Sequence, residues 1–563
     1  MDHFYTNERN HQILIALLKA HKISKVVASP GIANSVFIGS IQNDSFFSIY
    51  SAVDERSAAY MACGLAYESG EPVVISCTGA TAARNYMPGM TEAYYSKLPI
   101  LCITSSQPSC RIGHLQPQVT DRTSPPKDVA GLSVTLHSVH SAEDEWDCEI
   151  LANKAILELK RHGGKPVHIN LVTAYSYNTE TKLGQQELPP VRKIDRITSE
   201  DTFPALPEGR VGIFVGSHKK WPAKLRESVE KFCLAHNAVV FCDHTSNYNG
   251  KYKILFPLAI NQSPMIQQGT PAFRVDTLIH IGEVSGEENA PKMIKSKKTW
   301  RVSPDGEIRD WFRNLHYVYE MAEDTFFAHY AHGAKTETTE FYSECRQICE
   351  HLELELAQKH EIPFSNVWVA QKTASQIPEN SFTVLSILNT LRTWNYAQFK
   401  PSVEVFCPVG GFGIDGIPSL LLGAALSHPE RLHFGIVGDL AFFYDMNSLG
   451  NRHISDNIRI LLINNGCGFE FKKTYAMSYR LLGEAVSSYV AAEGHFGNKS
   501  SLLVKNYAEN LGFRYLCASN KDDFNAAINT FVSPQPQDKP LLLELFIGDE
   551  DERDALDCVH NRV

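Results

Sequence analysis

The chain has 563 residues, of which 43% are hydrophobic and 21% are charged, and its formal net charge is −10. These proportions are typical of a folded globular protein, and the length predicts three or four domains. The mild negative charge argues against a nucleic-acid-binding surface as its main function. No apolar run approaches the roughly 20 residues that cross a bilayer, so no membrane partner is expected.

The start of the sequence is polar and lacks the apolar core of a signal peptide. The chain contains 13 cysteines, which are scattered through strand-like stretches without metal-ligand spacing. Buried, reduced thiols in a cytoplasmic protein are the simplest interpretation.

The first part of the chain, residues 1–180, alternates strand-like and helix-like stretches, which is typical of a parallel, doubly wound sheet. Another short strand leads into Asp54-Glu55, and an alanine-rich helix is predicted to begin at about Arg56. A polar segment with two prolines, residues 178–194, is interpreted as a linker. The main predicted strands are Lys25–Ser29, Val73–Cys77, Ile100–Ser105 and Val167–Val172.

The same alternation continues in a middle part, residues 195–345, and a third part, residues 350–563. The middle part has no GxGxxG pattern, so no dinucleotide site is inferred there. The acidic run at 548–557 is interpreted as a solvated C-terminus. The sequence therefore predicts an α/β protein of three consecutive doubly wound, parallel-sheet domains. The strands predicted in these two parts are Val211–Gly216, Ala238–His244, Asp276–Gly282, Phe382–Ile387, Glu404–Cys407, His433–Val437, Ile458–Ile463 and Leu541–Phe546.

The most informative stretch of the sequence is residues 434–468. One apolar strand ends in Gly438-Asp439, a helix-compatible segment follows, and a second apolar strand ends in Asn464-Asn465-Gly466. Parallel strands joined by a helical crossover would bring Asp439 and Asn465 together at their C-terminal ends. A carboxylate and an amide oxygen, with a nearby carbonyl, suit a hard cation that holds a diphosphate. The alternative is an ordinary βαβ unit with a Gly-Asp turn.

This pattern resembles the motif of the thiamine diphosphate-dependent enzyme superfamily that includes pyruvate decarboxylase and acetolactate synthase. The resemblance implies that the side chains of Asp439 and Asn465 and the backbone carbonyl of Cys467 bind Mg²⁺. It implies three domains, of which 1–180 binds the pyrimidine ring, 195–345 is central and Rossmann-like, and 350–563 binds the diphosphate and Mg²⁺. The residues that it places against the cofactor are Glu55, Gly413, Ile414, Gly438, Asp439, Leu440, Asn465, Cys467 and Gly468.

Residues 50–66, YSAVDERSAAYMACGLA, supply a second and distant match. In the superfamily a glutamate at this place binds the aminopyrimidine ring of the cofactor, and Glu55 is the corresponding residue. A protonated carboxylate in a low-dielectric site favours the imino tautomer that removes the proton from the thiazolium carbon. The alternative is that the acidic pair merely stabilises a helix N-terminus.

Several local matches are closest to the branch of the menaquinone-pathway enzyme 2-succinyl-5-enolpyruvyl-6-hydroxy-3-cyclohexene-1-carboxylate synthase. Residues 410–416, GGFGIDG, include Ile414, which the resemblance identifies as the wedge that bends the cofactor. Residues 438–447, GDLAFFYDMN, and the loop at 78–92 also resemble that branch.

Two departures from that branch point to a different substrate. The branch has Ser-Arg-Ser after its first Pro-Gly, with the arginine binding a carboxylate of isochorismate, whereas this chain has Ala33 at the arginine position. The branch's Asn-Ser-x-x-x-Arg after the first strand of the third part is only loosely matched by residues 386–392, where Arg392 is a candidate for contact with an anionic substrate. We therefore expect a relative with another substrate pocket.

Four other residues are candidates for contact with the substrate. Gln116 and His114 lie in GHLQPQ, where relatives have a glutamine near the reacting carbon and decarboxylases have proton-relaying histidines. Asn34 and Phe469 adjoin the motifs already described. A surface loop or ordinary packing is the alternative for each of them.

Together these features predict an enzyme that uses thiamine diphosphate and Mg²⁺ to decarboxylate a 2-oxo acid and transfer the resulting acyl carbanion to an acceptor. Simple decarboxylation to an aldehyde is the alternative, and a non-catalytic cofactor-binding homologue is the second. Because Glu55 and Asp439 lie in different domains, the resemblance implies a homodimer or a dimer of dimers with active sites at the subunit interface.

Overall fold

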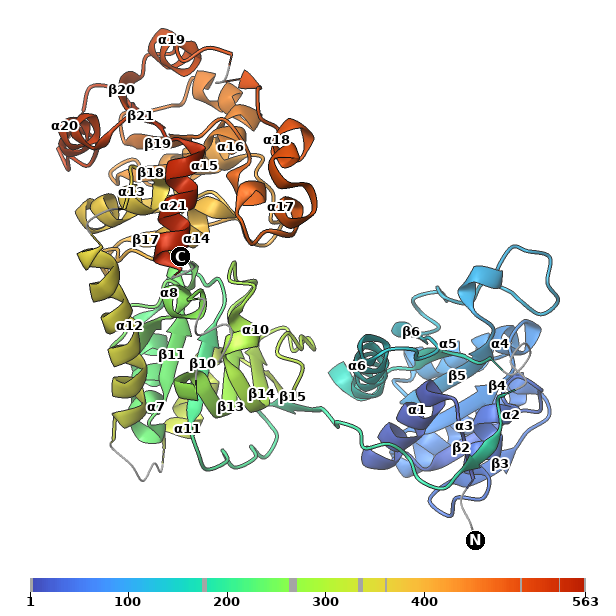
Figure 1. Cartoon of the computed structure of the whole chain (residues 1–563). Coiled ribbons are helices and arrows are strands. Elements are labelled where there is room, and N and C mark those ends of the chain that lie inside the picture. The colour runs from blue at the N-terminus through green and yellow to red at the C-terminus, as the bar shows by residue number, and fades with distance from the viewer. Residues whose placement is uncertain are drawn as a thin grey trace. The chain divides into compact units, whose positions relative to one another are not determined.

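The computed structural model describes residues 4–174, 180–262, 271–332, 338–359, 362–496, 499–535 and 537–560 (Figure 1). The chain divides into two compact units, each formed by two stretches of sequence. Unit 1 comprises residues 1–200 and 306–318, and unit 2 comprises residues 201–305 and 319–563. No described helix is long and apolar enough to cross a membrane.

Unit 1 is built on a six-stranded sheet in the order β3-β2-β4-β5-β7-β6, and every adjacent pair is parallel. The chain reverses its direction of winding between β2 and β4, so the loops after these two strands open a crevice at the carboxyl edge. The strands are β2 (Lys25–Ala28), β3 (Ser48–Ser51), β4 (Val73–Cys77), β5 (Ile100–Ser106), β6 (Leu132–Leu136) and β7 (Val167–Val172).

Helices cover both faces of this sheet, because successive strand residues point to opposite faces. Val26 packs with Leu14 of α1 in one buried cluster, whereas Val27 packs with Ala59 of α3 and Met90 of α5 in the other. The helices of unit 1 are α1 (Arg9–Ala20), α2 (Ser35–Ile41), α3 (Glu55–Ser69), α4 (Thr81–Asn85), α5 (Met87–Tyr95) and α6 (Ala142–Glu158).

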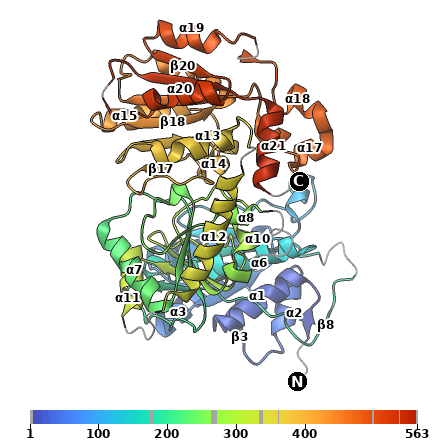
Figure 2. The same ribbon diagram turned by 60° about the vertical axis from the view of Figure 1, so that its left-hand side comes forward.

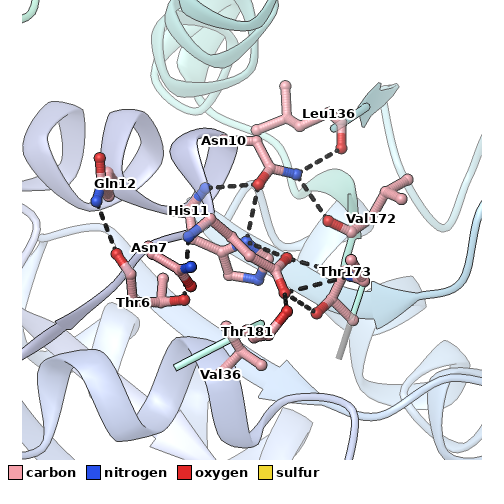
Figure 3. Close-up of polar contacts among 12 residues, drawn as sticks. Thr6, Asn7, Asn10, His11, Gln12, Val36, Leu136, Val172, Thr173 and Thr181 are labelled. Carbon is pink, nitrogen blue, oxygen red and sulfur yellow. Dashed lines mark hydrogen bonds and ion pairs between the residues drawn. The ribbon is translucent and has the colours of Figure 1, made fainter. Parts of the chain in front are cut away.

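The segment predicted as a linker is partly ordered against the N-terminus. Strand β8 (Leu183–Gln185) pairs antiparallel with β1 (Tyr5–Thr6), while residues 178 and 179 lie outside the described part. The Glu8 carboxylate accepts hydrogen bonds from the hydroxyls of Thr173 at 2.9 Å and Thr181 at 3.0 Å (Figure 3). These bonds fasten the segment to the residue that precedes α1. Polar side chains of the segment therefore form hydrogen bonds within the protein and are not all solvated.

Unit 2 contains a central sheet in which β12-β11-β10-β13-β14 are parallel neighbours. These strands are β10 (Val211–Val215), β11 (Val239–Cys242), β12 (Lys253–Leu255), β13 (Arg274–Ile281) and β14 (Lys295–Ser303). Strand β9 (Asp195–Thr198) lies just before the chain passes from unit 1 to unit 2. Strand β15 (Leu315–Glu320) spans the point where the chain returns to unit 2. The helices are α7 (Ala223–His236), α8 (Pro257–Ile260), α10 (Ala290–Met293), α11 (Glu323–Ala331) and the long α12 (Glu340–Gln358) (Figure 2).

The second sheet of unit 2 has the order β17-β16-β18-β19-β21-β20, again with every pair parallel. Its strands are β16 (Phe382–Leu385), β17 (Glu404–Phe406), β18 (His433–Gly438), β19 (Ile458–Asn464), β20 (Arg514–Ala518) and β21 (Leu541–Phe546). The helices are α13 (Asn366–Thr373), α14 (Asn389–Trp394), α15 (Ile417–Ser427), α16 (Asp439–Tyr444), α17 (Met477–Leu482), α18 (Val486–Tyr489), α19 (Leu503–Asn510), α20 (Lys521–Phe531) and α21 (Asp549–Val559).

The predicted α/β class is confirmed, and each predicted strand overlaps an observed one. The strands of the three parallel sheets lie within 1–180, 195–345 and 350–563, although these domain boundaries stay a prediction. All 13 cysteines are free, and Cys110 and Cys517 are exposed rather than buried.

One sequence prediction is wrong. The acidic run at 548–557 is not a solvated tail but forms most of α21. The buried face of α21 contains Glu552, Ala555, Leu556 and Val559, whose spacing is that of one helix face. Buried Glu552 accepts a hydrogen bond from the backbone N–H of Asn366 at 2.7 Å.

Candidate functional site

The second sheet of unit 2 brings Asp439 and Asn465 to the same edge. Gly438, the last residue of β18, pairs in register with Ile463 of β19, and Asp439 begins α16. Asp439 Oδ2 accepts a hydrogen bond from the backbone N–H of Gly466 at 2.6 Å, and its Oδ1 accepts one from Leu440 N–H at 2.7 Å. The predicted crossover therefore places the carboxylate against the turn that carries Asn465.

The Asp439 carboxyl group is 3% exposed. Burial raises its pKa to about 7, with a further contribution from the negative charge of Asp549, against the hydrogen bonds from backbone N–H groups. In the described part of the chain Asp439 forms no ion pair. A buried carboxylate without a cationic partner is a suitable ligand for an added cation.

The neighbouring donors are also oxygens. Asn465 is half-buried, and its Oδ1 accepts two long hydrogen bonds from Cys467, at 3.4 Å from the backbone N–H and at 3.9 Å from Sγ. Among those residues no group of three or more His, Cys, Asp or Glu side chains could hold a metal. The predicted set does not require one, because it combines one carboxylate, one amide oxygen and one carbonyl. This donor chemistry fits Mg²⁺.

A cavity opens at this edge of the sheet, between the loops that follow β16, β18 and β19. Of the residues predicted to meet the cofactor, Gly413 does not line the cavity but precedes Ile414, which does. Phe469, predicted to meet the substrate, is buried and also lines it. The predicted cofactor residues on the cavity wall are Ile414, Gly438, Asp439, Leu440, Asn465, Cys467 and Gly468.

A cluster of charged residues lies beside the turn after β19. Lys472 Nζ forms an ion pair with Asp549, and the Asp549 carboxylate accepts a hydrogen bond from Cys467 Sγ at 3.4 Å. Lys472 also lies 3.2 Å from Glu493. These residues are not predictable from the sequence, because no local pattern connects Lys472 with a residue 77 positions away.

Unit 1 places Glu55 at the first turn of α3, one residue earlier than the predicted helix start. Asp54 is the N-cap, and its side chain accepts hydrogen bonds from the N–H groups of Arg56 at 2.8 Å and Ser57 at 3.5 Å. Because Asp54 fills the capping role, the half-buried Glu55 is free for another one. Its carboxylate accepts a hydrogen bond from Asn85 Nδ2 at 3.2 Å. Asn85 belongs to the loop at 78–92 that resembles the menaquinone branch.

The other candidates in unit 1 have contrasting surroundings. His114 and Gln116 lie on an exposed loop, on either side of Leu115, which has a positive φ of 57°. Asn34 is buried, and its amide donates to the carbonyls of Ser29 at 2.9 Å and Ser76 at 3.4 Å. Asn34 therefore fastens the crevice loops, and its predicted contact with a substrate stays a prediction.

Arg392 lies in α14, near the cavity of unit 2. Its guanidinium forms an ion pair with Glu470, which lines that cavity, and lies 3.5 Å from Glu288. The side chain is 17% exposed, and the two glutamates outweigh burial and raise the pKa of Arg392. An anionic substrate would have to share this cation with Glu470.

Comparison with known proteins agrees with these features. Residues 9–124 match the model of the thiamine pyrophosphate enzyme, N-terminal TPP binding domain. A curated relative from Bacteroides fragilis, named 2-succinyl-5-enolpyruvyl-6-hydroxy-3-cyclohexene-1-carboxylate synthase, is 29% identical over 574 residues, covering 99% of each chain. Relatives with the same name from Bacteroides thetaiotaomicron (29% identical, 99% of each chain) and Phocaeicola vulgatus (28%, 98% of each chain) match over similar lengths.

The resemblance indicated by the motifs is confirmed, including its proximity to the menaquinone branch. This chain is therefore similar along nearly its whole length to these synthases, and its residues 9–124 are similar to the N-terminal TPP binding domain of thiamine pyrophosphate enzymes.

Proposed function

We propose that this chain is an enzyme that uses thiamine diphosphate and Mg²⁺ to decarboxylate a 2-oxo acid and transfer the acyl carbanion to an acceptor, forming a carbon–carbon bond. The observation that carries the proposal is the cavity at the edge of the second sheet of unit 2. There an unpaired buried carboxylate, Asp439, meets the amide of Asn465, the Cys467 turn and the apolar side chain of Ile414.

Asp439 Oδ, Asn465 Oδ1 and the Cys467 carbonyl would bind Mg²⁺, and the backbone N–H groups of the turn would face the diphosphate. When bound, thiamine diphosphate supplies the electron sink for cleaving the bond between the carboxylate and the carbonyl carbon. Ile414 would support the bent form of the cofactor, as a rigid apolar wedge.

Glu55 would hold a proton against the pyrimidine ring, and Asn85 would fix the direction of its carboxylate through the hydrogen bond at 3.2 Å. Since Asp54 already caps α3, the helix does not need Glu55 for its first turn. The presence of Glu55 together with Asp439 and Asn465 argues against the second alternative, a cofactor-binding homologue without turnover.

The substrate pair is proposed to differ from that named for the relatives. Ala33 occupies the position of their carboxylate-binding arginine and is 7% exposed, so it offers neither charge nor a polar contact. The acceptor therefore lacks one cationic anchor, while Arg392 forms an ion pair with Glu470 on the wall of the cavity of unit 2.

Simple decarboxylation to an aldehyde is the competing function. The observation that favours it is the exposed loop of His114 and Gln116, which presents an imidazole to solvent. In both cases we propose a cytoplasmic homodimer or dimer of dimers, with active sites between subunits.

The test is to measure CO₂ release by the full chain with thiamine diphosphate and Mg²⁺. The 2-oxo acids are pyruvate, 2-oxoglutarate, phosphonopyruvate and branched acids, each without and with aldehyde or unsaturated acceptors. Release only with an acceptor is expected. Release without one, with free aldehyde, would replace ligation by decarboxylation, whereas cofactor binding without release across the panel would support the non-catalytic alternative.

A further inference from the structure

A second cavity in unit 1 shares no lining residue with the pocket that follows β2. Its volume is about 360 Å³, and it is enclosed by α4, α5, the segment 121–130 and the face of β5 and β7. None of the predicted cofactor or substrate residues lines it. The proposed reaction therefore leaves this cavity without a role.

Arg122 enters this cavity with unused hydrogen-bond donors. Within the described part of the chain, its buried Nε and Nη1 have no hydrogen-bond partner, and its Nη2 donates only to Asn170 Oδ1, at 3.5 Å. The guanidinium packs against the backbone of Gly79, where a Cβ atom would lie 2.2 Å from Nη1. A charged side chain is therefore held in place without the partners that normally accompany burial.

The carboxylate of Asp121, also on the cavity wall, partly offsets the charge of Arg122 but makes no hydrogen bond to its guanidinium among the described residues. The Asp121 carboxylate is exposed, and its Oδ1 accepts hydrogen bonds from the Thr123 N–H at 3.0 Å and hydroxyl at 2.7 Å. Arg84 adds a second positive charge to the cavity wall and donates to the Asp121 carbonyl at 3.1 Å. Burial lowers the pKa of Arg122, and Arg84 lowers it further.

His168, on the floor of the cavity, supplies no charge either. Its Nε2 is 2.8 Å from Thr104 Oγ1 and its Nδ1 is 2.8 Å from Ser133 Oγ. Burial, with a contribution from Arg122, lowers its pKa to about 4, so the imidazole is neutral near pH 7. The cavity therefore has a net positive character that originates from its two arginines.

The remaining walls are largely apolar. Met87 and Met90 of α5 and Pro126 and Val129 of the segment 121–130 contribute to them. A hydrated inorganic anion would gain nothing from these side chains, whereas an apolar group would bury its surface against them. Methionine side chains also adapt to ligands of different shape.

We propose that this cavity binds a small organic carboxylate, with the carboxylate across Nε and Nη2 of Arg122, where Nη2 gives up its long bond to Asn170, and with the apolar body against Met90 and Val129. Adjacent donors of a guanidinium match the two oxygens of a carboxylate. The site is separate from the proposed active site, and binding requires neither cofactor nor turnover. Arg84 lies on the cavity wall and directly precedes Asn85, whose side chain donates a hydrogen bond to Glu55. An occupant of the cavity would therefore lie close to the residue that orients Glu55.

The first experiment is isothermal titration of the full chain with benzoate, benzyl alcohol and inorganic phosphate. Benzoate should bind, with benzyl alcohol and phosphate each weaker by about tenfold or more, because one lacks the charge and the other the apolar body. No benzoate binding, or equal affinity for phosphate, would overturn the proposal.

The second experiment compares Arg122→Met with Lys127→Met, which removes the same charge from an exposed position in the same segment. Arg122→Met should weaken benzoate binding by about tenfold to a hundredfold, and Lys127→Met should leave it unchanged. Benzoate binding that survives in Arg122→Met would show that another site is responsible.

Thermal unfolding without ligand distinguishes a ligand-binding role of Arg122 from a structural one. Because an unpaired buried guanidinium is unfavourable, Arg122→Met should melt at the same temperature as the parent chain or higher. A lower melting temperature, or failure to fold, would show that Arg122 stabilises the chain itself and would overturn the proposal.

Discussion

The carboxylate of Asp439 accepts a hydrogen bond from the backbone N–H of Gly466 at 2.6 Å. This bond connects the end of β18 to the turn after β19, so the side chain proposed to bind the metal also fixes the loop that carries Asn465 and Cys467. Removing the carboxylate would therefore affect ligand and loop together, and a matched control is needed to separate a local effect from loss of the fold.

Asp439→Ala should weaken Mg²⁺-dependent binding of thiamine diphosphate by about a hundredfold or more, because it removes a metal ligand and frees the turn. Calorimetric titration with the cofactor and Mg²⁺ measures this change. Asp456→Asn, on the exposed part of the same crossover, should bind normally. Unchanged affinity in Asp439→Ala would refute the metal site.

Glu55→Gln should retain cofactor but lose turnover by about 10²- to 10⁴-fold, because glutamine cannot hold the proton against the pyrimidine ring. Cofactor binding and CO₂ release should be measured on the same preparation. Asp54→Asn is the matched control, since asparagine caps helices as well as aspartate does and should keep both properties. Normal turnover in Glu55→Gln would remove Glu55 from the proposed chemistry.

Most strands were predictable because they are buried on both faces and appear as continuous apolar runs, as in β4 and β19. Strand β14 escaped prediction because its first half, with Lys295, Lys297 and Lys298, is charged and only its second half is buried. Edge strand β20 has only one fully buried position and no regular alternation of exposed and buried residues, which leaves too weak a pattern. In α21 the acidic residues obscured an apolar face that the spacing of Ala555, Leu556 and Val559 contains.

The candidate site was predictable where it is encoded in short, contiguous motifs. Asp439, Asn465 and Ile414 line one cavity because each follows a strand end or turn that the sequence marks with glycine. Arg122 and the pair formed by Lys472 and Asp549 could not be found in this way. The ion pair joins residues far apart in the chain, and the proposed role of Arg122 depends on donors without partners among the described residues. Neither feature leaves a local pattern in the sequence.

Glu287 predicts how stability depends on pH. This buried carboxyl group accepts hydrogen bonds from Asn395 at 3.1 Å and Asn261 at 3.3 Å. Burial, with a contribution from Asp243, raises its pKa from 4.5 to about 7, although Arg392 opposes the shift. The folded state therefore holds this proton more tightly than the unfolded state. The contribution of Glu287 to stability is complete below pH 4.5 and is lost as pH rises to about 7.

Unfolding by urea at several pH values between 4.5 and 8 measures this effect. The parent chain should lose up to about 3 kcal/mol of unfolding free energy over this range from Glu287. Glu287→Gln should show a correspondingly flatter profile, whereas Glu288→Gln, at an adjacent exposed position, should keep the parent slope. Equal slopes for all three proteins would contradict the assignment to Glu287.

The ion pair of Lys472 with Asp549 predicts a coupling between stability and cofactor binding. The Lys472 side chain is 5% exposed and that of Asp549 25% exposed, so Lys472→Met would leave a half-buried charge beside Cys467. We expect this variant to lose about 1–3 kcal/mol of unfolding free energy and to bind thiamine diphosphate more weakly. Adding Asp549→Asn should restore part of both losses, because it removes the unpaired charge. Strictly additive effects in this double-mutant cycle would show that the pair does not support the metal-binding turn.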